Sequence, residues 1–409
     1  MNLRKKVVRY AVEICSDLQE AGYEAYIVGG AVRDLYLNRA PKDYDISTNA
    51  TPEQIRNVFG RRRARIIGKR FRLVHLRVGR EVVEISTFRR PPEQKHQRRR
   101  GDTPEKMIFH DNEYGNVEED AVRRDFSVNA LYYDPIKDEV KDFLGTGLDD
   151  ISNKVVRIIG DPVTRFEEDP VRVLRALKLV GQYGFTMTPE TAQALKLSIP
   201  LISHVSTSRL SLELEKIMLS PYCVDVLDAL YRFGFLKYFL PFINAKWDTQ
   251  AGVYMRQLLR MKNERMLQGK YRNSISLSIS AMTLPFVEEE IGFADAGAQW
   301  ENFPGVSSKI RSVLFKVIEP LTFCKLVTAS SVRMLLIQPD FVEGKNDELI
   351  AERGYQHARE LMILQNEVMW HDDELEDIWP RRGTRTRADH DTDRPKKKGR
   401  RRRRGPKKD

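Results

Sequence analysis

The first 150 residues alternate between helical and strand-like spacing of hydrophobic positions. From residue 4 to residue 20, apolar side chains recur every three or four positions, which predicts an amphipathic helix. The apolar run Ala25–Val28 predicts a buried strand. Two further strand-like stretches, residues 71–78 and 81–88, follow each other closely enough to predict a hairpin. This part of the chain is therefore expected to combine helices with a sheet.

From about residue 160 the apolar positions keep to helical spacing. Val173, Leu174 and Leu177 mark one face of a helix that is predicted to end at Gly184. Helical patterning continues less regularly to Trp370. Residues 274–280 differ, because serine alternates there with isoleucine or leucine, and the sequence leaves this segment open between strand and helix. The predicted fold class is an α+β head followed by all-α parts.

The positive charge of the chain is concentrated at its C-terminal end. Lysine and arginine number 69 against 58 aspartates and glutamates, a formal net charge of +11. From Arg381 onward there are 15 basic and 4 acidic residues, again a difference of +11, so residues 1–380 are neutral overall. A polyanion would therefore be held elsewhere only by local clusters. The basic stretch 381–409 has no apolar stripe and is expected to be disordered.

Cysteine spacing and hydropathy limit the class of protein. The three cysteines lie far apart without CxxC spacing, so neither a disulfide framework nor a thiolate zinc site is predicted. No window reaches the roughly 20 apolar residues of a membrane span, and the N-terminus lacks the pattern of a signal peptide. We expect a soluble cytoplasmic protein with no membrane partner. The arginine-rich segment 89–106 is predicted to be a mobile loop.

Two aspartates share one face of a predicted strand near residue 45. Alternation places Asp43 and Asp45 on one side and Tyr44 with Ile46 on the other, packed inward. Bound cations relieve the repulsion between two such carboxylates, and a pair of metal ions can activate an attacking hydroxyl and stabilise a departing pyrophosphate. Taken alone, the motif favours a solvated strand end.

A glycine pair upstream changes that interpretation. The strand that ends at Val28 leads into Gly29 and Gly30 and then into a predicted helix, whose first N–H groups can bind a triphosphate with Arg33 nearby. A tight strand-to-helix turn is the alternative. Because the pair lies 13 residues ahead of Asp43, the combination favours a metal and nucleotide site.

Two further carboxylates are candidates for completing the metal site. Glu84 stands between two apolar residues that would face a core, and its alternative interpretation is a glutamate on the polar face of a strand. Asp125 follows Arg124 and precedes an apolar stretch interpreted as a helix, so a helix N-cap is its alternative role.

Asp169 and Arg172 are three residues apart, which would place them on one helical face. A carboxylate acceptor and a guanidinium donor so placed could read the edge of a base. By spacing alone, a helix N-cap and an ordinary surface ion pair are favoured.

Three segments, residues 26–60, 123–134 and 157–180, resemble the class II nucleotidyltransferases in sequence, order and spacing. This family contains bacterial poly(A) polymerases and CCA-adding enzymes, and the resemblance covers about residues 20–220. It implies a head similar to that of DNA polymerase beta, a neck that recognises the base, and a body that binds RNA. The implied parts are the head (1–150), the neck (151–220), the body (221–380) and the disordered basic tail (381–409).

The resemblance also implies roles for single residues. Asp43, Asp45 and Glu84 match ligands of two Mg²⁺ ions, and Asp125 matches an active-site aspartate. Asp169 and Arg172 match the pair that hydrogen-bonds the incoming base in place of a template. The positions that match nucleotide-binding residues are Gly29, Gly30, Arg33, Arg124, Arg165, Asp169, Arg172 and Arg175. The residues that resemble a later neck motif are Arg209, Glu213 and Lys216.

Two stretches separate the branches of the family. Ile66–Leu76 resembles the poly(A) polymerases, and the segment after Phe88 lacks the DxRRP or DxRHP sequence of CCA-adding relatives. The implied reaction transfers AMP from ATP to RNA 3′-hydroxyl ends with release of pyrophosphate, in RNA polyadenylation, processing and turnover. CCA addition to tRNA and a non-catalytic RNA-binding adaptor are the alternatives. RNA-decay proteins are conceivable partners, but no motif identifies them.

Overall fold

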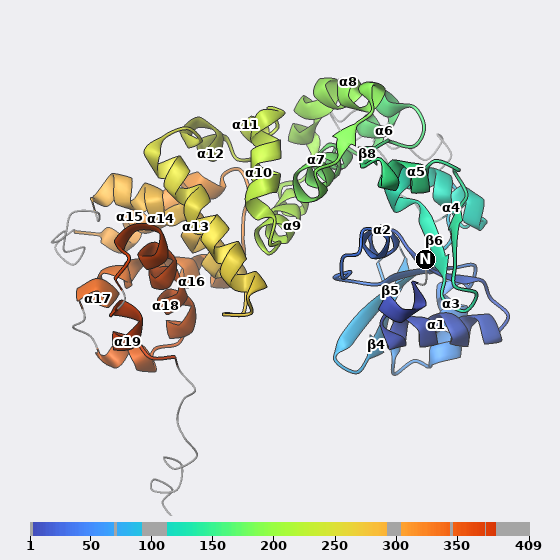
Figure 1. Ribbon diagram of the computed structural model, residues 1–409, viewed down its shortest axis with the longest axis horizontal. Coiled ribbons are helices and arrows are strands. Elements are labelled where there is room, and N and C mark those ends of the chain that lie inside the picture. The colour runs from blue at the N-terminus through green and yellow to red at the C-terminus, as the bar shows by residue number, and fades with distance from the viewer. Residues whose placement is uncertain are drawn as a thin grey trace, which may run out of the picture.

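The protein forms an arch, with a sheet-containing head at one end and a helical body at the other (Figure 1). The computed structural model describes residues 3–68, 72–91, 113–292, 304–343, 347–372 and 374–381. The loop predicted over residues 89–106 and the basic tail lie outside these ranges, apart from 89–91 and 381, so both remain predictions. The fold class, an α+β head followed by helical domains, is confirmed.

The head is built on a seven-stranded sheet with the order β3-β4-β5-β2-β1-β6-β7. Strands β2 and β5 run parallel, and the other neighbours are antiparallel. The predicted strand at residues 25–28 and the predicted hairpin are both confirmed, as β1 and as β4 with β5. The strands are β1 (Ala25–Val28), β2 (Asp45–Thr48), β3 (Ala64–Ile67), β4 (Leu73–Val78), β5 (Glu81–Thr87), β6 (Leu131–Asp134) and β7 (Glu139–Asp142).

Alternation along these strands gives the sheet two different buried faces. One face carries Ile27 and Ile46 into the large core, where α1 packs against β1 and β2. The opposite face carries a smaller aromatic cluster in which the rings of Tyr26, Phe88 and Tyr132 lie 6.0 to 6.5 Å apart. The helices of the head are α1 (Arg9–Glu20), α2 (Gly30–Tyr36), α3 (Pro52–Phe59), α4 (Val117–Arg123) and α5 (Gly147–Ser152).

The prediction of a helix after Asp125 is wrong. Only a short 3-10 turn, Ser127–Asn129, follows, and the chain then enters strand β6. All four residues of β6 are buried, since the strand lies inside the sheet with both faces covered. A short, continuous apolar run does not distinguish such a strand from a buried helix.

The neck consists of short helices and a two-stranded sheet. Helix α7 ends at Gly184, whose left-handed conformation (φ 67°) forms the C-cap, as the sequence predicts. The elements of the neck are β8 (Val155–Val156), α6 (Pro162–Glu168), α7 (Val171–Tyr183), β9 (Thr186–Met187), α8 (Pro189–Ser198) and α9 (Thr207–Met218).

The body is helical, and the open question at residues 274–280 is resolved as helix. Ser278 and Ser280 lie in α14, which is buried on nearly every side, so the segment shows no amphipathic stripe. The helices are α10 (Cys223–Arg232), α11 (Leu236–Phe239), α12 (Pro241–Lys246), α13 (Gln250–Leu267), α14 (Ile275–Ile291), α15 (Val306–Ile318), α16 (Lys325–Leu336), α17 (Gln338–Glu343), α18 (Tyr355–Gln365) and α19 (Leu375–Ile378).

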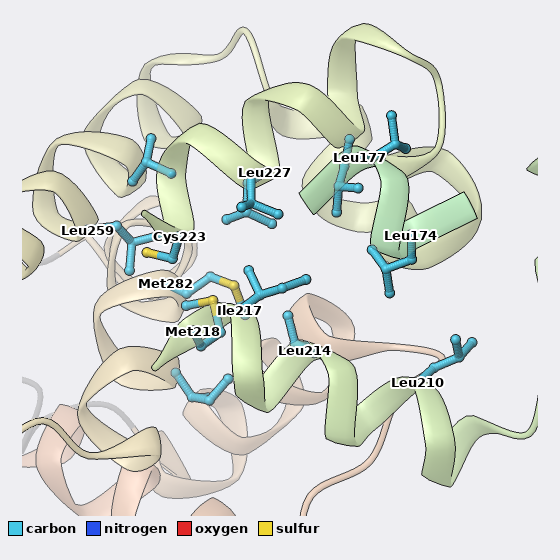
Figure 2. Close-up of a cluster of buried hydrophobic side chains, with 14 of the residues drawn as sticks. Leu174, Leu177, Leu210, Leu214, Ile217, Met218, Cys223, Leu227, Leu259 and Met282 are labelled. Carbon is cyan, nitrogen blue, oxygen red and sulfur yellow. The ribbon is translucent and has the colours of Figure 1, made fainter. Parts of the chain in front are cut away.

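Neck and body share one hydrophobic core. Figure 2 shows Leu174 and Leu177 of α7 facing Leu227 of α10, with Ile217 of α9 below them. At the end of α9, the buried ammonium of Lys262 donates to the carbonyl of Met218 at 2.7 Å. A cation at the C-terminal end of a helix is favourable. Helix α9 is therefore anchored in the body at one end.

The described residues contain no helix that is long and apolar enough to cross a membrane. The cysteines Cys15, Cys223 and Cys324 are all free.

Candidate active site

The predicted metal-binding carboxylates lie on the aromatic face of the head sheet. Asp45 opens β2, and Asp43 lies two residues before it, outside the strand, where its charge still acts on Asp45. The parallel register pairs Ile46 with Ile85, so Glu84 is the next residue out on the neighbouring strand and shares the face of Asp45. Asp43, Asp45 and Glu84 are all exposed. The three predicted residues thus gather around the first residue of β2, at a place that we call the carboxylate edge.

Asp45 has an unusual electrostatic environment. Its side chain reaches solvent, yet the surrounding protein desolvates it and, with the charges of Glu84 and Asp43, raises the pKa of Asp45 to about 6. Arg124 and Lys216 oppose this shift without cancelling it. Desolvation is thus the main cause of the raised pKa, and the two neighbouring carboxylates add to it.

The donor chemistry of this edge fits a magnesium ion, because Mg²⁺ prefers carboxylate oxygens. The full set of three ligands is not assembled, since no group of three or more His, Cys, Asp or Glu residues among the described parts of the chain is spaced to hold a metal. Glu84 instead lies 3.4 Å from Nε2 of His75 on β4. Metal binding by Asp43, Asp45 and Glu84 therefore stays a prediction, and Glu84 would have to leave His75 to take part in it.

The glycine turn lies directly beside this edge, because Val28 of β1 pairs with Asp45. Gly29 has a φ of 72°, which is unfavourable for residues with a side chain, and Gly30 begins α2. A Cβ atom on Gly29 would lie 3.5 Å from Nη1 of Arg124. The guanidinium of Arg124 thus lies beside the backbone turn at which a triphosphate is predicted to bind.

Arg124 is fixed by residues that the sequence analysis did not single out. Asp120, which is buried, accepts from Nη2 of Arg124 at 2.9 Å and from the Tyr132 hydroxyl at 2.7 Å. Tyr132 in turn accepts from Nε at 2.8 Å. These bonds leave Nη1 facing Gly29. The sequence does hint at the contact between Asp120 and Arg124, because the two residues are four positions apart, which is one helical turn.

Asp125 is buried and forms an ion pair with the half-exposed Arg175. Its Oδ1 accepts from the amide of Phe126 at 2.8 Å and from Nδ2 of Asn129 at 3.2 Å. Its Oδ2 lies 3.0 Å from Nη2 of Arg175, without hydrogen-bond alignment. Burial alone would raise the pKa of Asp125, but Arg175 and these hydrogen bonds hold it below its usual value.

The predicted base-reading pair does not share a helical face. Asp169 is extended between α6 and α7, and α7 begins only at Val171, so the expectation of one helical face is wrong. Oδ1 of Asp169 accepts from the Val171 amide at 3.1 Å, which is the capping role weighed as the alternative. Its Oδ2 accepts from Arg209 of α9 at 2.8 Å. The proline at position 170 breaks the helical period here.

Arg165 and Arg172 share one carboxylate partner, Glu168. Both guanidinium groups donate to Glu168, at 2.6 and 2.9 Å. Arg165 also donates to the carbonyls of Arg123 and Arg124, each at 2.6 Å. Arg165 therefore fixes the backbone that carries Arg124 and Asp125.

Arg33 points toward the neck. Its Nη1 donates to Oδ1 of Asn129 at 2.6 Å, its Nη2 donates to the Tyr183 hydroxyl at 2.6 Å, and Asp34 accepts from it at 2.8 Å. Contact between Arg33 and a phosphate therefore stays a prediction.

Comparisons with known proteins agree with this architecture. Residues 25–157 match the family model of the Poly A polymerase head domain, and residues 184–246 match that of the probable RNA and SrmB-binding site of polymerase A. Poly(A) polymerase I of Escherichia coli O6:H1 is 32% identical over 377 residues, which cover 89% of this chain and 80% of that protein. That of Haemophilus influenzae is 37% identical over 252 residues, which cover 61% of this chain and 55% of the relative.

CCA-adding enzymes are also similar to the chain. That of a Geobacillus species is 36% identical over 263 residues, which cover 64% of this chain and 62% of that enzyme. Among solved structures, the Bacillus stearothermophilus CCA-adding enzyme in complex with CTP has a TM-score of 0.59 at 23% identity, covering 88% of this chain and 77% of that one. This structural likeness shows the nucleotidyltransferase fold. The chain belongs to the family of bacterial poly(A) polymerases and tRNA nucleotidyltransferases.

Proposed function

We propose that the protein is a template-independent poly(A) polymerase that transfers AMP from ATP to RNA 3′-hydroxyl ends. The observation that carries this proposal is the cluster of three carboxylates, Asp43, Asp45 and Glu84, beside the Gly29–Gly30 turn. The charges of Asp43 and Glu84 both act on Asp45. Similarity to poly(A) polymerase I over 89% of the chain supports adenylate over CCA addition. The proposed setting is the cytoplasm, in RNA 3′ processing and turnover.

In this proposal, Asp43, Asp45 and Glu84 hold two Mg²⁺ ions, Glu84 by rotating away from His75. When bound, the ions supply charge neutralisation at the attacking hydroxyl and at the departing pyrophosphate. The chain's own contribution is geometric, because phosphoryl transfer depends mainly on alignment and electrostatics.

The remaining predicted residues act on the nucleotide. The turn at Gly29 and Nη1 of Arg124 bind the triphosphate. Arg175, which is half-exposed, keeps donors available for phosphate beyond its contact with Asp125. Asp169 and Arg172 hydrogen-bond the adenine edge after exchanging their present partners.

The test incubates purified protein with labelled RNA, Mg²⁺ and each nucleoside triphosphate singly. The proposal predicts a long ladder with ATP alone. Addition limited to C, C and A on a truncated tRNA would transfer the assignment to the CCA-adding branch. Binding of RNA without extension by any nucleotide would favour a non-catalytic adaptor.

A further inference from the structure

A continuous series of side-chain contacts connects the head to helix α7 of the neck. We call it the head–neck bridge. Its five members come from α2, from the segment around the 3-10 turn 127–129, and from α7. They are Arg175, Asp125, Asn129, Arg33 and Tyr183.

Asn129 is the centre of the bridge. Its Oδ1 accepts from Nη1 of Arg33 at 2.6 Å, and its Nδ2 donates to Oδ1 of Asp125 at 3.2 Å. A carboxamide can accept from a guanidinium and donate to a carboxylate at the same time, which neither a carboxylate nor an ammonium can do. Both ends of the amide are therefore used, and its orientation is fixed by its partners.

Tyr183 closes the other side of the bridge. Its hydroxyl accepts from Nη2 of Arg33 at 2.6 Å and donates to Oδ1 of Asp34 at 2.7 Å. The guanidinium of Arg33 also lies over the Tyr183 ring, with Cζ 4.4 Å from its centroid. Because Arg33 and Tyr183 are both buried, water does not readily replace these contacts.

The bridge clamps α7 to the head at two points. Arg175 and Tyr183 are eight residues apart, which is two turns and about 12 Å along the helix. Two contacts at that separation fix both the distance and the rotation of α7. Arg172 lies one turn before Arg175, and Arg33 follows Gly30 by three residues. The bridge therefore joins the structures proposed to hold the two ends of one nucleotide.

We propose that Asn129 and Tyr183 are positioning residues that set the distance between the triphosphate turn and the base-reading residues, and so determine selectivity for the base. This inference rests on the proposed function. A nucleotide held at the turn presents its base to Asp169 and Arg172 only if α7 keeps its place. Loosening the bridge should then affect discrimination between bases more than binding of the triphosphate, which all nucleotides share.

The experiment compares wild type with Asn129→Ala, Tyr183→Phe and the double variant. Tyr183→Phe keeps the ring and removes only the hydroxyl link. Asn153→Ala is the matched control, because Asn153 is an exposed asparagine at the C-cap of α5 whose side chain donates to the carbonyl of Asp149 in the same turn. The readout is the ratio of kcat/KM for ATP to that for CTP in single-nucleotide addition to RNA.

Each single variant loses two hydrogen bonds to charged groups and is expected to lower this ratio by at least about tenfold. The double variant should be little worse than the more affected single variant, since both changes interrupt the same bridge. Asn153→Ala should match wild type. An unchanged ratio in folded Asn129→Ala and Tyr183→Phe, or fully additive losses, would overturn the proposal.

A second measurement requires no activity. Hydrogen exchange of backbone amides in residues 171–183 and 30–36 should be about tenfold faster in Asn129→Ala and Tyr183→Phe than in Asn153→Ala. Unchanged exchange in both segments would overturn the positioning role. A wild type that extends no RNA would contradict the proposed function, and the exchange rates would still decide the role of the bridge.

Discussion

The pKa values of two carboxylates, Asp45 in the head and Glu213 in the neck, are shifted in opposite directions. Asp45 on the head faces other carboxylates, and its pKa is raised to about 6. Glu213 on neck helix α9 is held between Lys178 and Lys216, each at 3.0 Å. Although its burial favours protonation, these two ammonium groups lower the pKa of Glu213 to about 2. Neighbouring cations therefore compensate the charge of Glu213, whereas those near Asp45 do not offset its desolvation and its carboxylate neighbours.

Such a difference is typical of structural as opposed to ligand-binding acidic residues. A compensated carboxylate such as Glu213 stabilises the fold above its pKa. A crowded carboxylate such as Asp45 costs stability when ionised, and such arrangements are common where a ligand supplies the missing charge. The comparison therefore predicts that neutralising the two residues will have opposite effects on stability and unequal effects on activity.

The largest effect is expected from Asp45→Asn. It should reduce RNA extension with ATP about 10³-fold, because a metal ligand contributes several kcal/mol to charge stabilisation. The variant should unfold at the same or a higher temperature than wild type at pH 8 without Mg²⁺. The folded-state pKa of Asp45 is raised, so its ionisation removes stability as the pH rises from about 4 to about 6.

The matched control is Asp17→Asn, since Asp17 is exposed on α1, on the outside of the head. Its extension rate should equal that of wild type. If Asp45→Asn extended RNA at the wild-type rate, the metal assignment would be abandoned.

The next effect concerns the choice of nucleotide. Arg172→Ala should lower the preference for ATP over CTP by about 10- to 100-fold in kcat/KM, because a site that hydrogen-bonds a base loses discrimination with its donor. Steady-state addition of a single nucleotide measures this. An unaltered preference together with reduced stability would limit Arg172 to its contact with Glu168.

On the neck side of the comparison, Glu213→Gln should lower the free energy of unfolding by about 1 to 3 kcal/mol at pH 7. The change leaves Lys178 as a partly buried cation whose pKa is already lowered by desolvation. Denaturant unfolding measures the loss.

The loss of stability in Glu213→Gln should depend on pH. Glu213 has a lowered pKa, so its contribution is complete above about pH 4.5 and disappears as the pH falls toward about 2. The difference between wild type and Glu213→Gln should shrink over that interval. A difference that grew on acidification would contradict the pairing.

The smallest effect on chemistry is expected from deleting residues 381–409. The deletion removes 15 basic residues, so RNA binding should weaken and its dependence on salt should become shallower. ATP binding should change little. Titrations of RNA at several salt concentrations measure the slope, and an identical slope in both proteins would exclude the tail from RNA contact.

Local sequence patterns predicted much of the head but less of the site. The inward packing of Tyr44 and Ile46 is confirmed, although strand β2 begins only at Asp45 and leaves Asp43 outside it. The glycines after Val28 form the predicted turn into a helix, while their binding of a triphosphate stays a prediction. The buried strand β6 and the buried helix α14 were not resolved, because uniform burial removes the periodicity on which prediction depends.

The contacts that fix the site are long-range and leave little trace in the sequence. Asp169 meets Arg209 across 40 residues, and Arg33 meets Tyr183 across 150. No spacing rule relates residues so far apart. Their partners could be found only once α7 and α9 were placed beside the head.

Metal-directed cleavage tests the central claim most directly. Fe²⁺ can replace Mg²⁺ at oxygen ligands and, with ascorbate and peroxide, cuts the backbone beside its site. The account predicts cuts near residues 43–45 and near Glu84 that excess Mg²⁺ suppresses and that Asp45→Asn abolishes. Cuts confined to other parts of the chain, or cuts at β2 that persist in Asp45→Asn, would contradict it.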